Sequence, residues 1–316
     1  MPMLRLGLCP ELPRWKGQFV DDIIAISAVL HRNLVKLYGC CYERHHRLLV
    51  YEYLPNGSLD HAPFGGGNSL HLDWSTRFEI CMGVARGLAY LHEEASVRIV
   101  HRDVKAGNIL LDSNLLPKIS DFGLAKLYDD KKTHITHMSF RTNASGYLAP
   151  EYAMRGHLTE KTDVYAFGIV ALELVSGRKN FDVNLGNEKK NLLEWAWNLH
   201  KNSRQVELVD QKLIEFNMEE VKRMIGIALL CTYTSHSLRP SMSRVMAMLT
   251  GHVEVSEVTS KLGYLTDWRI DDTSSSSFSA FQTIDTGTSA SYSTGFVAPR
   301  EGDYKPMLGV KINAGR

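Results

Sequence analysis

The stretch Ile99–Asp112 decides the fold and reads Ile-Val-His-Arg-Asp-Val-Lys-Ala-Gly-Asn-Ile-Leu-Leu-Asp. Its two ends are apolar runs that predict short buried strands. Between them lie a carboxylate at Asp103, a cation at Lys105 and an amide at Asn108. The pattern therefore predicts a loop that holds three polar side chains at one end of a hydrophobic core.

These three side chains suit the transfer of a phosphoryl group, in which a protein mainly positions the reactants and balances charge. Asp103 can accept or orient a hydroxyl proton, and Lys105 can face a phosphate oxygen. Asn108 can supply a carbonyl oxygen to Mg²⁺, a cation that prefers oxygen ligands. Any one of them alone fits an ordinary loop, and only their order and spacing indicate this chemistry.

Three further motifs follow in the chain. Lys-Ile-Ser-Asp-Phe-Gly ends at Gly123, Tyr-Leu-Ala-Pro-Glu ends at Glu151, and Asp-Val-Tyr-Ala-Phe-Gly begins at Asp163. Together with the first stretch, they resemble the motifs of protein kinases in the same order. The run from Gln18 to Leu249 resembles the kinase domain of a plant receptor-like kinase, of the subgroup whose extracellular part carries leucine-rich repeats.

This resemblance implies an α+β fold of the two-lobed protein-kinase type, with a truncated β lobe and a complete, mainly helical second lobe. Residues 18–54 would form the partial small lobe and residues 55–250 the large lobe, while residues 1–17 stay unassigned. Residues 251–316 would be a tail, because their Ser- and Thr-rich composition cannot bury a core.

The resemblance also implies an ATP-dependent protein serine/threonine kinase that uses Mg²⁺. Lys105, two residues after Asp103, matches serine/threonine kinases. The catalytic residues would be Asp103, Lys105 and Asn108, with Asn108 and Asp121 as metal ligands. Adenine would contact the hinge at Glu52 and Leu54 and rest on Leu110.

Other residues would support the site. His101 and Phe122 would pack in an internal spine, and Asp163 would accept backbone N–H bonds from the catalytic loop. Arg102 would hold a phosphate on the activation segment. The candidates for that phosphate are Thr133, Thr136, Ser139, Thr142 and Ser145. Glu151 and Arg239 would form a buried ion pair.

The chain departs from the kinase pattern in three places. Residues 1–17 contain neither the glycine-rich hairpin nor the Ala-x-Lys that holds the ATP phosphates, and Leu6 stands where that lysine belongs. Asp22 stands where the family has Glu, and it fits equally well a solvated first helical turn, where acids suit the helix dipole. The run Thr142–Tyr147 replaces an expected Gly-Thr-x-Gly-Tyr, so the threonine that contacts the catalytic aspartate cannot be assigned.

Periodicity predicts the secondary structure around these motifs. Residues 34–42 and 47–53 predict a β-hairpin. A helix over residues 18–30 would bury Leu30, and Asp73 would cap the next helix. The later predicted helices cover residues 73–92, 159–177, 192–199, 218–231 and 241–249.

Composition excludes several classes of function. A formal net charge of +1 gives no reason to expect nucleic-acid binding. Five cysteines without metal spacing do not form a disulfide framework, which favours a reducing compartment. No window reaches the roughly 18 apolar residues of a membrane helix, so membrane attachment would depend on a region upstream of this chain.

Three interpretations remain open from the sequence. The chain is an active kinase acting on protein substrates, with co-receptor kinases as partners on the cytoplasmic side of the plasma membrane. Alternatively, it is a catalytically impaired pseudokinase or scaffold. If the chain is complete as given, we expect it to be soluble in the cytosol. In the third interpretation it is an incomplete copy of a longer receptor kinase.

Overall fold

The structure is a computed structural model that describes residues 27, 29–43, 46–61, 71–127 and 146–256. The chain divides into two units, Met1–Trp268 and Arg269–Arg316, and every described residue belongs to the first. The predicted small-lobe helix therefore lies almost wholly outside the described residues. The prediction that Leu30, at the end of this helix, is buried was wrong. Leu30 is 73% exposed, and the neighbouring Val29 is buried instead.

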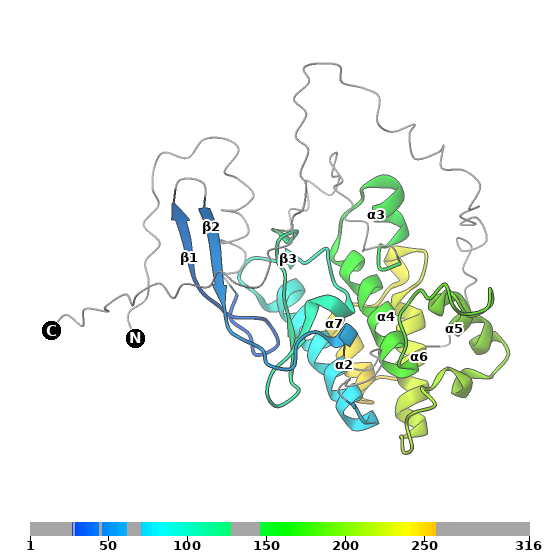
Figure 1. Ribbon diagram of the computed structural model, residues 1–316. Helices are drawn as coiled ribbons and strands as arrows, with labels where there is room; N and C mark the ends of the chain where they lie inside the picture. The colour runs from blue at the N-terminus through cyan, green and yellow to red at the C-terminus, as the bar shows by residue number, and fades with distance from the viewer. Residues whose placement is uncertain (1–26, 28, 44–45, 62–70, 128–145, 257–316) are drawn as a thin grey trace, which may run out of the picture. The chain divides into compact units, whose positions relative to one another are not determined.

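The predicted hairpin is present as β1 (Leu37–Glu43) and β2 (His46–Tyr51), which pair antiparallel (Figure 1). The first strand begins later than predicted, because Leu34 forms a parallel bridge with Ile119. The N–H of Val35 donates to the Ile119 carbonyl at 2.9 Å. The residues before β1 thus pair with the strand that leads to the Asp-Phe-Gly motif.

Two further pairs of short strands flank the loop that carries Asp103. β3 (Ile99–Val100) pairs antiparallel with β6 (Lys126–Leu127). β4 (Ile109–Leu111) pairs antiparallel with β5 (Pro117–Ile119). The loop that carries Asp103 is therefore anchored by a strand at each end, as the apolar runs predict.

Helices make up most of the remaining structure. Asp73 caps the first of them, since its Oδ1 accepts a hydrogen bond from the Thr76 N–H at 2.8 Å. The α-helices are α2 (Trp74–Ala89), α3 (Pro150–Arg155), α4 (Glu160–Ser176), α5 (Leu192–Lys201), α6 (Met218–Cys231) and α7 (Met242–Leu249). Shorter helical turns are η2 (Leu59–His61), η3 (Tyr90–Glu94), η4 (Ala106–Asn108), η6 (Gln205–Leu208) and η7 (His236–Leu238).

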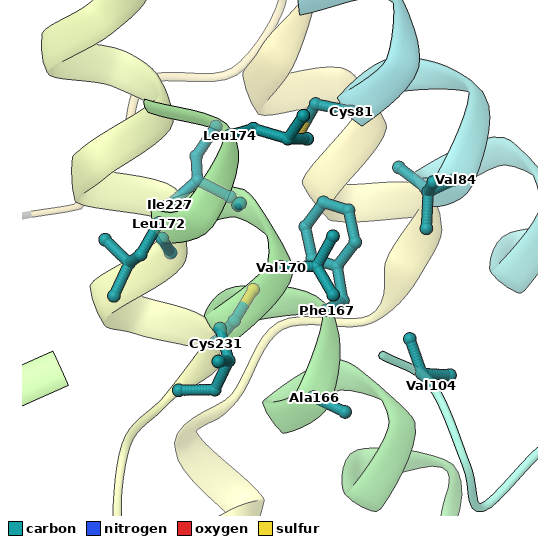
Figure 2. Close-up of a cluster of buried hydrophobic side chains, with 14 of the residues drawn as sticks. Cys81, Val84, Val104, Ala166, Phe167, Val170, Leu172, Leu174, Ile227 and Cys231 are labelled. Carbon is teal, nitrogen blue, oxygen red and sulfur yellow. The ribbon is translucent and has the colours of Figure 1, made fainter. Parts of the chain in front are cut away.

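Helix α4 lies in the centre of the core and is buried along almost its whole length. Thr159 caps its start and Gly177, at φ 62°, ends it. A helix that is apolar on all sides must be covered on all sides, and α2 and α6 pack against it. Figure 2 shows Phe167 and Val170 of α4 between side chains of α2 and α6. The motif that begins at Asp163 therefore lies in the buried core of the fold.

Three of the five cysteines have side chains that the structure describes. Cys40, Cys81 and Cys231 are free thiols, and the last two are buried in this core. Within the described ranges, no helix is long and apolar enough to cross a membrane.

Replacing Gly168 with alanine is expected to lower the free energy of unfolding by about 1 to 3 kcal/mol, because α4 and α6 meet there. A Cβ on Gly168 would lie 2.7 Å from Thr232 Cγ2 and 2.8 Å from the Ala228 carbonyl oxygen. The measurement is urea unfolding followed by circular dichroism. Gly186→Ala is the matched control, since a Cβ there meets nothing within 4 Å; equal losses in the two variants would contradict the close helix contact.

Candidate functional site

The structure brings Asp103, Lys105 and Asn108 together. Lys105 Nζ donates to Asp103 Oδ2 at 2.7 Å, and Asn108 Nδ2 donates to the same oxygen at 3.0 Å. Asn108 Nδ2 also donates to the Asp103 carbonyl oxygen at 2.7 Å. The short helix η4 produces this arrangement, because it turns the chain back between Lys105 and Asn108.

The surroundings of the Asp103 carboxylate stabilise its charged form, which can accept hydrogen bonds. Only 4% of its side chain is exposed, and a buried charge needs partners of opposite charge or hydrogen bonds. Lys105, 19% exposed, supplies the opposite charge. Since Oδ2 is bonded to Lys105 and Asn108, Oδ1 is the oxygen that could accept a proton from a hydroxyl group.

Asp163 fixes the backbone of the loop, as predicted. Its Oδ2 accepts from the His101 N–H at 2.7 Å and its Oδ1 accepts from the Arg102 N–H at 2.8 Å. His92 Nε2 lies 2.9 Å from Oδ2. Burial alone would raise the pKa of the Asp163 carboxyl, but the hydrogen bond and charge of His92, with a smaller contribution from His101, hold the pKa below its usual value. An ionised carboxylate in the core thus ties α4 to the catalytic loop.

These bonds also hold an uncommon backbone conformation. Arg102 has φ 71°, in the left-handed region that side-chain-bearing residues rarely adopt. Such a residue costs about 1 to 3 kcal/mol and persists only where its surroundings enforce it. The Asp163 carboxylate enforces it here by accepting the Arg102 N–H.

His101 packs against Phe122, as the resemblance implies. Both are fully buried, and their rings meet edge to face with centroids 4.9 Å apart. His101 Nε2 lies 3.0 Å from the Ser120 carbonyl oxygen, and Nδ1 lies 3.3 Å from the Asp103 N–H. Burial lowers the pKa of His101 despite the nearby Asp163, so the imidazole is neutral at pH 7. It donates from Nε2, accepts at Nδ1 and joins the Asp-Phe-Gly segment to the catalytic loop.

The side chain of Arg102 has partners that the sequence did not indicate. Its Nη2 and Nε donate to the Tyr152 hydroxyl at 2.6 and 3.2 Å, and its Nη1 donates to the Leu124 carbonyl oxygen at 3.0 Å. Tyr152 directly follows the Ala-Pro-Glu motif, where no residue pattern distinguished it from an ordinary helix residue. The predicted phosphate contact of Arg102 cannot be seen, because Thr133, Thr136, Ser139, Thr142 and Ser145 lie outside the described residues, as does Asp22.

The candidate metal ligands lie on connected segments. The Asn108 carbonyl oxygen accepts from the Ser120 N–H at 2.8 Å and from Ser120 Oγ at 2.9 Å, which fixes the residue before Asp121. Asp121 is exposed, has φ 61°, and its Oδ1 accepts from the Gly123 N–H at 3.3 Å.

These ligands fit Mg²⁺. Because Asn108 Nδ2 donates a hydrogen bond to Asp103, the amide oxygen of Asn108 is the side-chain atom that can bind a cation. One carboxylate and one amide oxygen match the few protein ligands that Mg²⁺ takes when it also binds phosphates. Within the described part of the chain, no group of three or more His, Cys, Asp or Glu could hold a metal.

At the predicted hinge, the side chain of Glu52 has contacts that the sequence did not predict. Its Oε1 accepts from Lys118 Nζ at 2.9 Å and from the Lys36 N–H at 2.7 Å. The ion pair joins the hinge to β5, three residues before Asp121. Leu54 is buried and Leu110 is half-buried, and the adenine contacts implied for these residues stay predictions.

The predicted pair of Glu151 and Arg239 is present. Arg239 Nη1 and Nη2 donate to the two carboxylate oxygens of Glu151, both at 2.7 Å. The Arg239 side chain is fully buried. It also donates to the carbonyl oxygens of Tyr233, Lys161 and Thr234. The pair holds the segment after the Ala-Pro-Glu motif against the last third of the described chain.

One more buried carboxyl group was not predicted. Glu173 of α4 accepts from the Tyr147 hydroxyl at 2.8 Å and from the Asn180 N–H at 2.8 Å. Burial raises the pKa of Glu173 to about 8, and these two donors only partly oppose it. Glu173 reads in the sequence as one polar residue in an apolar helix, so only the three-dimensional contacts reveal its role.

Comparison with known proteins agrees with this geometry. The family model described as protein tyrosine and serine/threonine kinase matches residues 13–249. Two probable LRR receptor-like serine/threonine-protein kinases of Arabidopsis thaliana are each 73% identical over 307 residues, which is 95% of this chain and 29% of each relative. Cold-responsive protein kinase 1 of the same plant is 50% identical over 256 residues, 79% of this chain and 65% of that protein.

The chain therefore spans less than a third of the length of the two receptor-like relatives. The matched region contains the catalytic loop, the Asp-Phe-Gly segment and α4. The predicted α+β kinase fold is confirmed, and the chain belongs to the protein tyrosine and serine/threonine kinase family.

Proposed function

We propose that this chain is the catalytic domain of a plant receptor-like protein serine/threonine kinase, which transfers the γ-phosphoryl group of ATP to protein hydroxyl groups. The observation that supports it most is the cluster of Asp103, Lys105 and Asn108. The names of the relatives supply the serine/threonine specificity and the receptor context.

In this proposal Asp103 orients the attacking hydroxyl and accepts its proton. Lys105 lies beside it, so its ammonium group can balance the charge of a phosphate that arrives at the same place. Asp163 contributes by holding the loop backbone, which keeps the Asp103 carboxylate in position without the substrate having to order it.

Asn108 and Asp121 would hold Mg²⁺, and the bound ion would supply charge neutralisation on the ATP phosphates. The backbone at Glu52 and Leu54 would contact adenine, and Leu110 would lie beneath it. In the full-length protein the domain would act on the cytoplasmic side of the plasma membrane, on protein substrates and beside co-receptor kinases.

Asp103→Asn is expected to reduce phosphoryl transfer to a serine- or threonine-containing protein by about 10²- to 10⁴-fold, the usual contribution of a general base. The measurement is transfer of labelled phosphate from ATP, with Mg²⁺ present, followed by identification of the phosphorylated amino acid. The substitution keeps the size of the side chain, so a folded variant is expected.

Glu207→Gln is the control, because the side chain of Glu207 forms an exposed ion pair with Arg204 whose loss should leave transfer unchanged. Equal transfer by the wild-type and Asp103→Asn chains would contradict the proposal. Binding of ATP without any transfer by the wild-type chain would instead indicate a non-catalytic scaffold.

A further inference from the structure

The guanidinium group of Arg102 joins three segments of the chain. Arg102 itself directly precedes Asp103. Its Nη1 donates to the carbonyl oxygen of Leu124, the residue after the Asp-Phe-Gly motif, at 3.0 Å. Its Nε and Nη2 donate to the hydroxyl oxygen of Tyr152, in α3, at 3.2 and 2.6 Å. One cation therefore connects the loop that carries Asp103 both to the segment after Asp121 and to α3.

Tyr152 is itself held by the core of the fold. The residue is 5% exposed, and its ring centroid lies 5.7 Å from Arg102 Cζ, close enough for a cation–π attraction. Its N–H donates to the Ala149 carbonyl oxygen at 3.1 Å. The residue before it, Glu151, forms the buried ion pair with Arg239. The position of the Tyr152 hydroxyl is therefore set by α3 and by the core that anchors α3.

The chemistry of the two groups fixes the direction of their hydrogen bonds. A guanidinium has only N–H donors and is not deprotonated in proteins, so the tyrosine oxygen must accept both bonds. Nε and Nη2 form one edge of the planar group, and such an edge can also bind the oxygens of a phosphate. The Tyr152 hydroxyl thus supplies an acceptor to Arg102, for which the resemblance to kinases implies a phosphate.

The conformation of Arg102 gives this contact a consequence for Asp103. Arg102 has φ 71°, a conformation that depends on its surroundings. Asp163 of α4 holds its backbone by accepting the Arg102 N–H at 2.8 Å. Tyr152 holds the same residue by its side chain, from α3. Because Asp103 is the next residue, a shift of Arg102 would displace the Asp103 carboxylate, and small displacements of a reacting group lower a rate strongly.

We propose that Tyr152 is a positioning residue for phosphoryl transfer, which acts through the Arg102 guanidinium to hold the Asp103 carboxylate in place. This role rests on the proposed function and deepens it. It requires no contact of Tyr152 with ATP or with the protein substrate. Tyr152 and Asp163 would then hold one loop from two different helices.

Tyr152→Phe tests the proposal, since it removes the hydroxyl and keeps the ring. We expect kcat to fall by about 10- to 100-fold, the factor that corresponds to one hydrogen bond to a charged group, with little change in the KM for ATP. Tyr233→Phe is the matched control, because Tyr233 is also buried and its ring packs on Trp197. Its kcat should match that of the wild type. An equal kcat in the two variants would overturn the proposal.

A double-mutant cycle tests whether Tyr152 acts through Arg102. Arg102→Met removes the guanidinium, so adding Tyr152→Phe to this variant should have little further effect on kcat. If the two losses multiply instead, the hydroxyl acts by another route and the proposal is wrong.

Hydrogen–deuterium exchange separates the proposal from the proposed function, because it needs no phosphoryl transfer. The amides of residues 101–103 should exchange faster in Tyr152→Phe than in the wild type, and at the wild-type rate in Tyr233→Phe. Equal protection in all three chains would overturn the positioning role even if the wild type is an active kinase. Faster exchange in Tyr152→Phe, in a chain that transfers no phosphate, would support the link from Tyr152 to the loop and contradict only the proposed function.

Discussion

Arg239→Met is expected to lower the free energy of unfolding by about 3 to 5 kcal/mol, because it leaves the Glu151 carboxylate largely buried without its partner. The two nitrogens of Arg239 that bond Glu151 do so at 2.7 Å, and the arginine side chain has no exposed area. The guanidinium also satisfies the carbonyl oxygens of Tyr233 and Lys161. Urea unfolding followed by tryptophan fluorescence gives the free energy.

Two comparisons make this result specific. The double variant Glu151→Met with Arg239→Met should be more stable than Arg239→Met alone, because it no longer buries an unpaired charge. Recovery should be partial, since the carbonyl oxygens that Arg239 satisfied stay without a donor. Arg204→Met, which breaks an exposed pair with Glu207, should cost far less, because ion pairs on the surface contribute little to stability. Equal costs for Arg239→Met and Arg204→Met would show that the buried pair is not important for stability.

Glu173→Gln is expected to stabilise the protein, and to do so more strongly as the pH rises. Burial raises the pKa of Glu173 from 4.5 to about 8. Between these two values the unfolded chain has released the proton and the folded chain retains it, so stability falls as pH increases. Glutamine is uncharged and can keep the bonds to Tyr147 and Asn180, so the variant loses this pH dependence.

The gain from Glu173→Gln should be about 3 kcal/mol larger at pH 8 than at pH 5, at about 1.4 kcal/mol for each unit of pKa shift. Urea unfolding of both chains at pH 5, 6, 7 and 8 measures it. Glu188→Gln is the control, since Glu188 is exposed and its stability curve should run parallel to that of the wild type. If the curve of Glu173→Gln also runs parallel to the wild type, the carboxyl is ionised in the fold and the account of its pKa is wrong.

The sequence predicted the parts of the site that depend on neighbours in the chain. Asp103, Lys105 and Asn108 lie within six residues, so one loop brings them together wherever it folds. The position of α4 was also predictable. The apolar run between Thr159 and Gly177 has the length of a buried helix, and a threonine and a glycine are common at the two ends of a helix.

Contacts between distant segments were predicted only where a family motif pointed to them. The bonds from Asp163 to the catalytic loop and the pair of Glu151 with Arg239 were expected on that basis. The contacts of Tyr152 with Arg102 and of Lys118 with Glu52 were not predicted. A tyrosine in a helix and a lysine in a short strand look the same in the sequence whether or not they contact a distant partner. Leu30 was assigned to the wrong face for a similar reason: periodicity gives the helix but not the residue at which it ends.

The central claim is that Asn108 and Asp121 form a working site for Mg²⁺ and ATP. Calorimetric titration of the chain with ATP in the presence of Mg²⁺, beside an Asp121→Asn variant, tests it most directly. Asparagine tolerates the left-handed backbone at this position, so the variant removes the charge with little strain. The account predicts binding by the wild-type chain that weakens about tenfold or more in the variant, in line with the usual cost of disturbing a metal site. No detectable binding by either chain, or equal binding by both, would contradict it.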